Sequence, residues 1–190
     1  MTQRFSTDIL VIGGGAAGLS AALHLAPHAR VTVLCKGDIE SASSTWAQGG
    51  IAAVIDPEDS ADSHIEDTLT AGAGLCDQEA VRFTVEGASR AIDDLLRWGV
   101  HFDAEDNHFH LTREGGHSFR RILHVADATG RAIIETLNQR VLDHPRIELF
   151  RDRVAIDLIN HSKFSRHPTR CAGAYVLNRS TGHVEVFQAK

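Results

Sequence analysis

The sequence is poor in cysteine, proline and aromatic residues, and it lacks long apolar runs. Its three cysteines (Cys35, Cys76 and Cys171) are odd in number and far apart, which is typical of a reducing compartment without a disulfide framework. No uninterrupted apolar run reaches the ~18 residues of a membrane span, and the N-terminus does not have the pattern of a signal peptide. A net charge of −6 and scattered aromatic residues argue against a nucleic-acid or anionic-membrane surface. These absences predict a cytoplasmic globular protein.

The residues that are present predict one substantial domain that begins with a βαβ unit. The 190 residues are 43% hydrophobic and 23% charged, as in ordinary globular chains. The apolar, β-branched run Asp8–Ile12 predicts a buried strand, and the Ala- and Leu-rich segment after the glycines predicts a helix that Pro27 ends. Residues 31–34 (VTVL) predict a second strand, which should be parallel to the first.

Further along the chain, the pattern changes from helices to short strands. Helices are predicted at 61–71, from an N-cap at Asp77 to near Gly99, and from ADATG to Pro145. Strands are predicted at 51–55, 147–150, 154–159, 172–177 and 184–189, with a turn at 178–183 and an exposed basic loop at 160–170. The predicted fold class is therefore α/β, with a parallel sheet plus short antiparallel strands near the C-terminal end. Because the chain stops within a strand pattern, we expect it to be an incomplete part of a longer protein.

The glycine turn after the first strand is the first motif that carries chemistry. Gly13-Gly14-Gly15-Ala16-Ala17-Gly18 fits G-x-G-x-x-G, in which glycines allow a tight turn, close approach to a diphosphate and close helix–strand packing. The helix N-terminus then offers free N–H groups to phosphates. Since the motif follows a strand and opens a helix, it predicts a Rossmann-like dinucleotide site; helix packing alone is the competing interpretation.

The end of the second strand departs from the usual dinucleotide fingerprint. The acidic residue that grips ribose hydroxyls is replaced by Cys35-Lys36, and no carboxylate follows until Asp38. This weakens a simple NAD interpretation. Lys36 is a candidate contact for ribose or phosphate, and a solvated lysine is an equally good interpretation. We interpret Cys35 as a core thiol.

Three blocks of sequence resemble a known flavoprotein family. GGGAAGLSAALHLA, STWAQGGIAAV and HLTREGGHSFRRILHVADATGRAI are similar to the family of succinate dehydrogenase, fumarate reductase and L-aspartate oxidase, and most similar to its aspartate-oxidising branch. The resemblance covers essentially all of residues 1–190, and it implies the N-terminal part of an FAD-binding domain. It also implies oxidation of L-aspartate to iminoaspartate with oxygen or fumarate as acceptor. That reaction is the first step of de novo NAD biosynthesis, whose product quinolinate synthase uses.

The same resemblance implies which residues bind FAD. Besides the glycine turn and Lys36, they are Ser43, Ser44, Thr45, Trp46, Ala47, Gln48, Gly49 and Gly50, together with the backbone of Val154 and Ala155 near the adenine. In the respiratory members, a His bonded covalently to the flavin occupies the position of Ser43, so FAD should be held non-covalently here. The competing interpretations are an ordinary Ser/Gly turn and a plain core strand. Trp46 either covers the cofactor or packs.

Glu114 separates the branches of the family. The dicarboxylate-specific members carry a Phe before the Gly-Gly of the third block, where this sequence has Glu114. A carboxylate would pair with the ammonium group that distinguishes aspartate from succinate, and it would lose its partner when succinate binds. A solvated loop position is the competing interpretation.

Other functional groups remain unassigned. The twelve histidines show no metal-ligand spacing with Cys or carboxylates, so no metal site is predicted, and the roles of His117 and His124 stay open. The resemblance implies that the proton-accepting Arg and the carboxylate clamp lie outside this sequence, so we expect these 190 residues to be inactive alone. Two alternatives stay open: a relative specific for succinate or fumarate, and a non-catalytic nucleotide-binding module.

Overall fold

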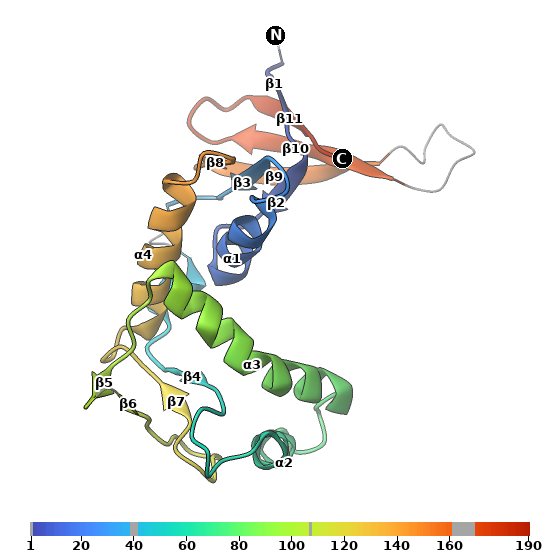
Figure 1. Ribbon diagram of the computed structural model, residues 1–190. Helices are drawn as coiled ribbons and strands as arrows, with labels where there is room; N and C mark the ends of the chain where they lie inside the picture. The colour runs from blue at the N-terminus through green and yellow to red at the C-terminus, as the bar shows by residue number, and fades with distance from the viewer. Residues whose placement is uncertain (1, 39–41, 107, 161–169) are drawn as a thin grey trace. The chain divides into compact units, whose positions relative to one another are not determined.

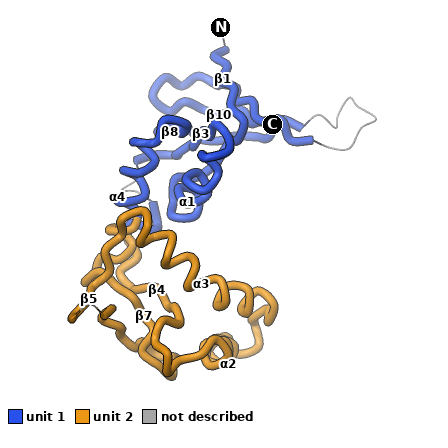
Figure 2. Tube along the Cα trace, viewed as in Figure 1, with its two compact units in different colours: residues 1–45, 134–190 blue, residues 46–133 orange. Residues whose placement is uncertain are grey.

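The computed structural model describes residues 2–38, 42–106, 108–160 and 170–190, which divide into two compact units. Unit 1 comprises residues 1–45 and 134–190, and unit 2 comprises residues 46–133 (Figure 2). One boundary between the units falls at the end of the short 3₁₀ helix η2 (Ser43–Trp46). The other falls within α4 (Thr129–Leu142). Unit 2 is therefore an insertion between two segments of unit 1. The single domain predicted for the whole chain stays a prediction, because compact units can belong to one domain.

Unit 1 contains the predicted βαβ unit. Its parallel sheet has the order β2 (Ile9–Ile12), β3 (Val31–Leu34) and β8 (Ile147–Phe150), with α1 (Ala16–Leu25) connecting the first two strands (Figure 1). All four residues of β3 are buried, as expected for the central strand of a covered sheet. The prediction of a parallel α/β arrangement in this segment is confirmed.

A second, mostly antiparallel sheet completes unit 1. Its order is β1 (Arg4–Ser6), β11 (Val184–Gln188), β10 (Cys171–Asn178) and β9 (Arg153–Asn160). The hairpin from β10 to β11 confirms the predicted turn, whereas β1, which pairs in parallel with β11, was not predicted. A core of Leu34, Ala174, Val176 and Phe187 joins the two sheets. The predicted basic loop at 160–170 lies outside the described residues, except at its two ends.

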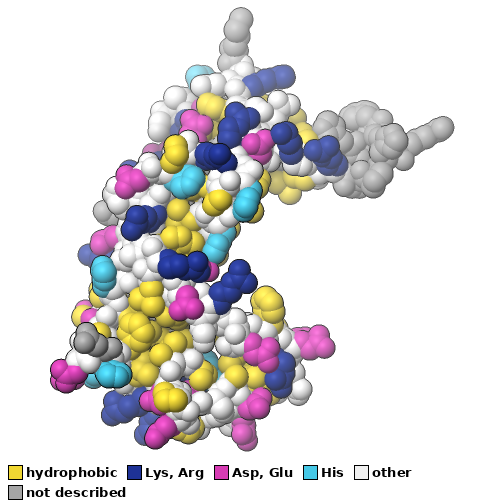
Figure 3. Space-filling model, viewed as in Figure 1, with side chains coloured by type: hydrophobic (Ala, Val, Ile, Leu, Met, Phe, Trp, Pro, Cys, Tyr) yellow, Lys and Arg dark blue, Asp and Glu magenta, His cyan; other side chains and the backbone are white. Residues whose placement is uncertain are grey.

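Unit 2 is built around two helices that pack together, α2 (Ala61–Ala71) and α3 (Gln78–Trp98). Asp77 caps α3 by accepting a hydrogen bond from Ala80 N at 2.9 Å, and the helix ends at Gly99 with φ +102°, a conformation that favours glycine. Both helix ends were predicted. Hydrophobic side chains are visible on the face of unit 2 that Figure 3 presents.

The described residues in the rest of unit 2 include four short strands. They are β4 (Ile51–Ala52), β5 (Ala104–Glu105), β6 (His108–Phe109) and β7 (Ile122–Leu123). β4 pairs with β7, and β5 pairs with β6. The predicted strand at 51–55 is therefore shorter than expected, and the segment 101–123 contains strands where irregular structure was predicted. None of the described helices has the length and apolar character needed to cross a bilayer.

Candidate functional site

The glycine turn in unit 1 has a shape that only glycine permits. Gly13 has φ +122°, and its N–H donates to Leu34 O at 2.9 Å, which ties the turn to the end of β3. A Cβ atom on Gly14 would collide with Cys35 Sγ, and one on Gly18 would collide with the carbonyl oxygen of Gly13. The turn is therefore pressed against β3 on one side and α1 on the other, as the dinucleotide motif requires.

The turn opens into a concave site at the N-terminus of α1. A cavity of about 230 Å³ is lined by Gly13, Gly14, Gly15, Cys35, Lys36, Gly37, Asp38, Ala42 and Ser43. No side chain caps α1 at Gly15, and its first turn contains no acidic residue. The N-terminus of α1, where Ala16 N makes a long hydrogen bond of 3.4 Å to Ser44 Oγ, and the positive end of the helix dipole thus face a hollow, and this arrangement fits a diphosphate. The site accordingly fits the diphosphate of a dinucleotide cofactor.

Cys35 and Lys36 occupy the end of β3 differently. Cys35 is buried, and burial raises the pKa of its thiol above the ordinary value, so it is an inert core thiol as predicted. Lys36 is exposed at the rim of the cavity, and its carbonyl oxygen accepts a hydrogen bond from Arg179 Nη1 at 3.0 Å. This placement is compatible with a phosphate or ribose contact.

The start of β9 lies beside the same strand end. Arg153 N donates to Cys35 O at 2.9 Å, so the half-buried residues Val154 and Ala155 follow directly after a contact with the end of β3. Unit 1 therefore brings together the glycine turn, Lys36, Ser43 and the start of β9. The adenine contact of Val154 and Ala155 stays a prediction.

Ser43, Ser44 and Thr45 form most of η2 in unit 1, while Trp46 to Gly50 belong to unit 2. Ser44 Oγ accepts a long hydrogen bond of 3.4 Å from Ala16 N at the start of α1. In unit 2, Ala47 O accepts a hydrogen bond from Gly130 N at 2.9 Å. Trp46 is 69% exposed, so it does not pack in the core of the structure. Hydrogen bonds of Ser44 Oγ and Ala47 O thus hold the loop, while the side chain of Trp46 stays exposed.

Glu114 lies beside this loop in unit 2. β4, which follows the loop, pairs with β7, and β7 also forms a β-bridge with Thr112 through Ile122. Through β7, the loop and the segment that carries Glu114 are therefore held close together. Glu114 Oε1 lies 3.7 Å from the position that a Cβ atom would take on Gly49, and the residue is exposed. Gly50 has no room for a side chain because Ile122 and Leu123 pack against it. Gly49 and Glu114, which are 65 positions apart in the sequence, therefore lie side by side.

The structure adds one cluster that the sequence did not predict, around Arg121, and shows the contacts of His124, whose role the sequence left open. Arg121 is completely buried and binds Asp59 and Asp67, and the only local signal was a second arginine directly before an apolar pair. His124 contacts Asp103 (Nδ1–Oδ2, 3.1 Å) and His110 (Nε2–Nδ1, 3.1 Å). Within the described ranges, no cluster of three or more His, Cys, Asp or Glu is arranged to hold a metal ion.

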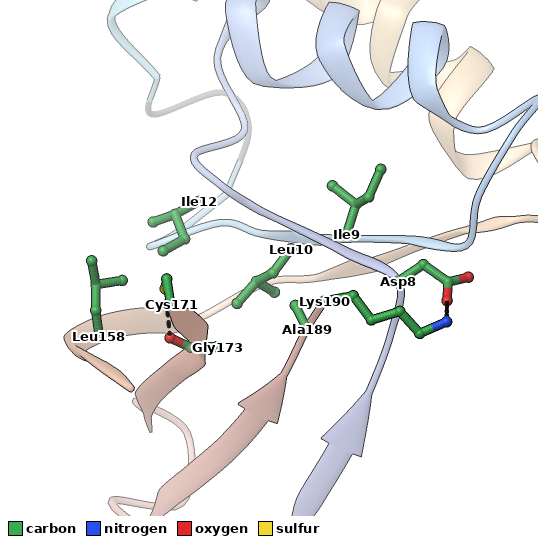
Figure 4. A pocket seen from close by; sticks show the side chains of 9 residues that line it. All are labelled: Asp8, Ile9, Leu10, Ile12, Leu158, Cys171, Gly173, Ala189 and Lys190. Atoms are coloured by element: carbon green, nitrogen blue, oxygen red, sulfur yellow. Dashed lines mark hydrogen bonds and ion pairs between the residues drawn. The ribbon is translucent and has the colours of Figure 1, made fainter. Parts of the chain in front are cut away.

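A second hollow in unit 1, of about 330 Å³, lies along β2 (Figure 4). Half-exposed Ile12 and Leu158 line it, and Lys190 Nζ binds Asp8 Oδ1 at 2.7 Å at its rim. It contains none of the predicted site residues, so it is distinct from the hollow at the glycine turn.

The βαβ unit and the uncapped glycine turn define a dinucleotide-binding domain of the α/β class. Comparison with known families identifies the group: the chain belongs to the FAD binding domain family, whose model matches residues 8–190, and FAD is its cofactor. The predicted family and cofactor are confirmed.

Curated relatives narrow the resemblance. The chain is 52% identical to the L-aspartate oxidase of Pseudomonas aeruginosa, over 100% of this chain and 37% of the relative. It is 47% identical to that of Synechocystis and 43% identical to the chloroplastic L-aspartate oxidase 2-a of Nicotiana tabacum, over 96% of this chain and 32% and 28% of the relatives. The chain thus spans about a third of the length of these relatives.

Solved structures confirm the fold class. The chain is 29% identical to Escherichia coli quinol fumarate reductase FrdA with a TM-score of 0.89, covering 98% of this chain and 32% of that one. It is also 29% identical to the apo Sdh1 complex of Mycobacterium smegmatis, with a TM-score of 0.88 over 98% of this chain and 33% of that one.

Proposed function

We propose that this chain is the N-terminal part of an enzyme that oxidises L-aspartate to iminoaspartate, with oxygen or fumarate as the electron acceptor. Its relatives named L-aspartate oxidase and the position of Glu114 beside Gly49 support the proposal. The observation that carries it is this carboxylate, which lies next to the loop predicted to meet the flavin. The reaction would be the first step of de novo NAD biosynthesis, in the cytoplasm, with quinolinate synthase receiving the product.

In that reaction, the residues of this chain would bind the cofactor. FAD, when bound, supplies the two-electron acceptor. The glycine turn and the N-terminus of α1 would hold the diphosphate, and Lys36 would add a positive charge at the rim of the same hollow. Residues 46–50 would present backbone N–H groups and the Gln48 amide to the flavin. Ser43 cannot form the histidyl bond of the respiratory members, so the cofactor would be held non-covalently.

Glu114 would select the substrate. Aspartate differs from succinate by one ammonium group, and a carboxylate at Glu114 would form a charge-assisted hydrogen bond with it. With succinate, the same carboxylate would be partly desolvated without a partner, which disfavours binding. Among the described residues, the exposed Glu114 carboxylate forms no ion pair, so it is available to a ligand.

The test is Glu114→Gln in the full-length enzyme that carries this chain. Since a hydrogen bond to a charged group contributes ~1.5–3 kcal/mol, we expect kcat/KM for L-aspartate to fall by roughly 10- to 150-fold, chiefly through KM. Discrimination against succinate should shrink as well. Steady-state kinetics with both substrates measure the effect.

The matched control is Glu105→Gln, which removes an exposed carboxylate in β5 of the same unit. This variant should leave both substrates unaffected. If Glu114→Gln kept the wild-type preference for aspartate, the assignment of Glu114 would be wrong. A wild-type enzyme that oxidised succinate and not aspartate would favour the dicarboxylate-specific alternative.

A further inference from the structure

The side chain of Arg121 is the largest fully buried one in the described part of the chain, and it is charged. Its Nε donates to Asp59 Oδ2 at 2.7 Å, and its Nη2 donates to Asp59 Oδ1 at 2.8 Å. This two-bond contact joins the start of β7 to the residue before the N-cap of α2. A buried guanidinium is stable only with such partners, because its desolvation is otherwise very costly.

Asp67 is the second partner, and it connects Arg121 to the loop that carries Glu114. Arg121 Nη1 donates to Asp67 Oδ2 at 2.7 Å. The same carboxylate accepts from Ser118 N at 2.7 Å and from Ser118 Oγ at 2.6 Å. Asp67 lies in the middle of α2, so these bonds anchor the end of the loop to a rigid helix. We call Asp59, Asp67, Ser118 and Arg121 the Arg121 network.

The loop at 113–118 has few other contacts; one of them is between His117 Nδ1 and Arg121 Nη1, at 3.3 Å. Its residues are exposed except for partly buried His117, and two of them are glycines. Its internal hydrogen bond, from His117 N to Glu114 O, is long at 3.3 Å. Ordering backbone costs ~1–2 kcal/mol per residue, so an exposed glycine-rich loop keeps one conformation only when its ends are fixed. Thr112 fixes one end through its bridge to Ile122, and Ser118 fixes the other through Asp67.

The charge state of Asp67 suits this task. Burial alone would raise the pKa of its carboxyl, but hydrogen bonds from Ser118 and Arg121 outweigh burial and lower the pKa to about 2. Asp67 is therefore a carboxylate at any pH used for enzyme assays. It can accept all three hydrogen bonds at once, which a protonated acid or an amide cannot do equally well.

We propose that Asp67 and Arg121 are positioning residues, which hold the 113–118 loop so that Glu114 stays beside Gly49. The proposal rests on the function proposed above for Glu114. Substrate selection then depends on two elements. The 113–118 loop supplies the carboxylate of Glu114, and α2 fixes the position of that loop. Neither Asp67 nor Arg121 needs to contact the substrate.

The experiment compares three variants of the full-length enzyme. Asp67→Asn weakens the contacts with both Ser118 and Arg121, while Ser118→Ala removes one hydrogen bond and leaves the ion pairs intact. We expect the KM for L-aspartate to rise roughly tenfold in Asp67→Asn and less in Ser118→Ala, with little change in kcat. Ser118→Thr keeps the hydroxyl group and should retain the wild-type KM.

A second readout does not depend on activity. A glutamate-specific protease cleaves after Glu114, and its rate reports how often the loop leaves its bound conformation. Cleavage should accelerate in Asp67→Asn and Ser118→Ala. The control is Asp62→Asn, which removes a carboxylate from the same helix that is 88% exposed and lies outside the Arg121 network. This variant should match the wild type in both measurements.

The outcomes separate this proposal from the proposed function. A folded Asp67→Asn variant with wild-type KM and cleavage rate overturns the positioning role; if that variant fails to fold, Ser118→Ala decides in the same way. If Glu114→Gln has no effect on substrate preference but cleavage still accelerates, the function of Glu114 is wrong and the tether itself is supported. If Glu114→Gln alters preference but Asp67→Asn does not alter KM, the tether is wrong and the function stands.

Discussion

At the scale of single residues, Gly18 shows how closely α1 is pressed onto the glycine turn. A methyl group there would meet the backbone oxygen of Gly13, which cannot move without opening the turn. We expect Gly18→Ala to lower the free energy of unfolding by ~1–3 kcal/mol and to weaken FAD binding. Urea unfolding and titration of flavin fluorescence measure the two effects.

Gly87 provides the control for that substitution. It lies within α3, and a Cβ atom there would meet nothing within 4 Å. Gly87→Ala should raise the stability by ~0.5–1 kcal/mol, because alanine favours helix, and should not affect FAD binding. Similar losses in both variants would show that the contact between Gly18 and Gly13 does not constrain the turn.

Much of the candidate site was predictable at this scale because its signals are local. The glycine turn, Lys36 and the thiol of Cys35 lie within short segments whose spacing carries the chemistry. Glu114 was predicted from resemblance, and only the structure shows that it lies beside Gly49. The Arg121 network could not be predicted, since Arg121 and Asp59 are 62 residues apart and their contact depends on the packing of α2.

At the scale of elements, the N-terminus of α3 offers a sharp test of capping. Asp77 accepts a hydrogen bond from Ala80 N, which would otherwise have no partner within the helix. We expect Asp77→Ala to lower the free energy of unfolding by ~1 kcal/mol, whereas Asp77→Asn, which retains a capping oxygen, should cost much less. Thermal or urea unfolding checks this. An equal loss in both variants would mean that the negative charge, and not the cap, stabilises α3.

Long helices and strands could be predicted from the sequence, whereas very short strands could not. α3 was predicted from a repeated apolar period, whereas α1 was predicted from its Ala and Leu content and the strands of the βαβ unit from short apolar runs. β1 has three residues and pairs through its backbone with β11, which is about 180 residues away in sequence (Arg4 with Val186). β4 to β7 have two residues each, too few for any periodicity to appear. Such short strands form because a strand from a distant part of the sequence pairs with their backbone.

At the scale of the whole molecule, the two units should respond differently to acid. His64 in unit 2 is buried, and burial followed by the positive charge of Arg121 and His117 lowers its pKa below 6.5, against smaller opposite effects of Asp59 and Asp67. In the unfolded chain His64 therefore binds a proton near pH 6.5, whereas in the folded unit it binds one only at lower pH. The contribution of neutral His64 to the free energy of unfolding is fully present above pH 6.5, and it is lost as the pH falls through and below that value.

Tryptophan fluorescence can follow this loss, because both tryptophans, Trp46 and Trp98, lie in unit 2. We expect the urea midpoint reported by tryptophan to decrease between pH 7 and pH 5. His64→Gln should reduce this decrease, while His101→Gln, at an exposed position of the same unit, should not. A midpoint independent of pH in the wild type would contradict the burial of a neutral His64.

The parallel pairing of β1 with β11 has a mechanical consequence. These strands lie next to the two ends of this chain, and three residue pairs join them, from Arg4–Val186 to Ser6–Gln188. Opposite forces on Gln3 and Ala189, which flank β1 and β11, would slide the two parallel strands along each other, so their hydrogen bonds would be loaded together in shear rather than opened one by one. The inserted unit would carry no tension until this clamp had ruptured.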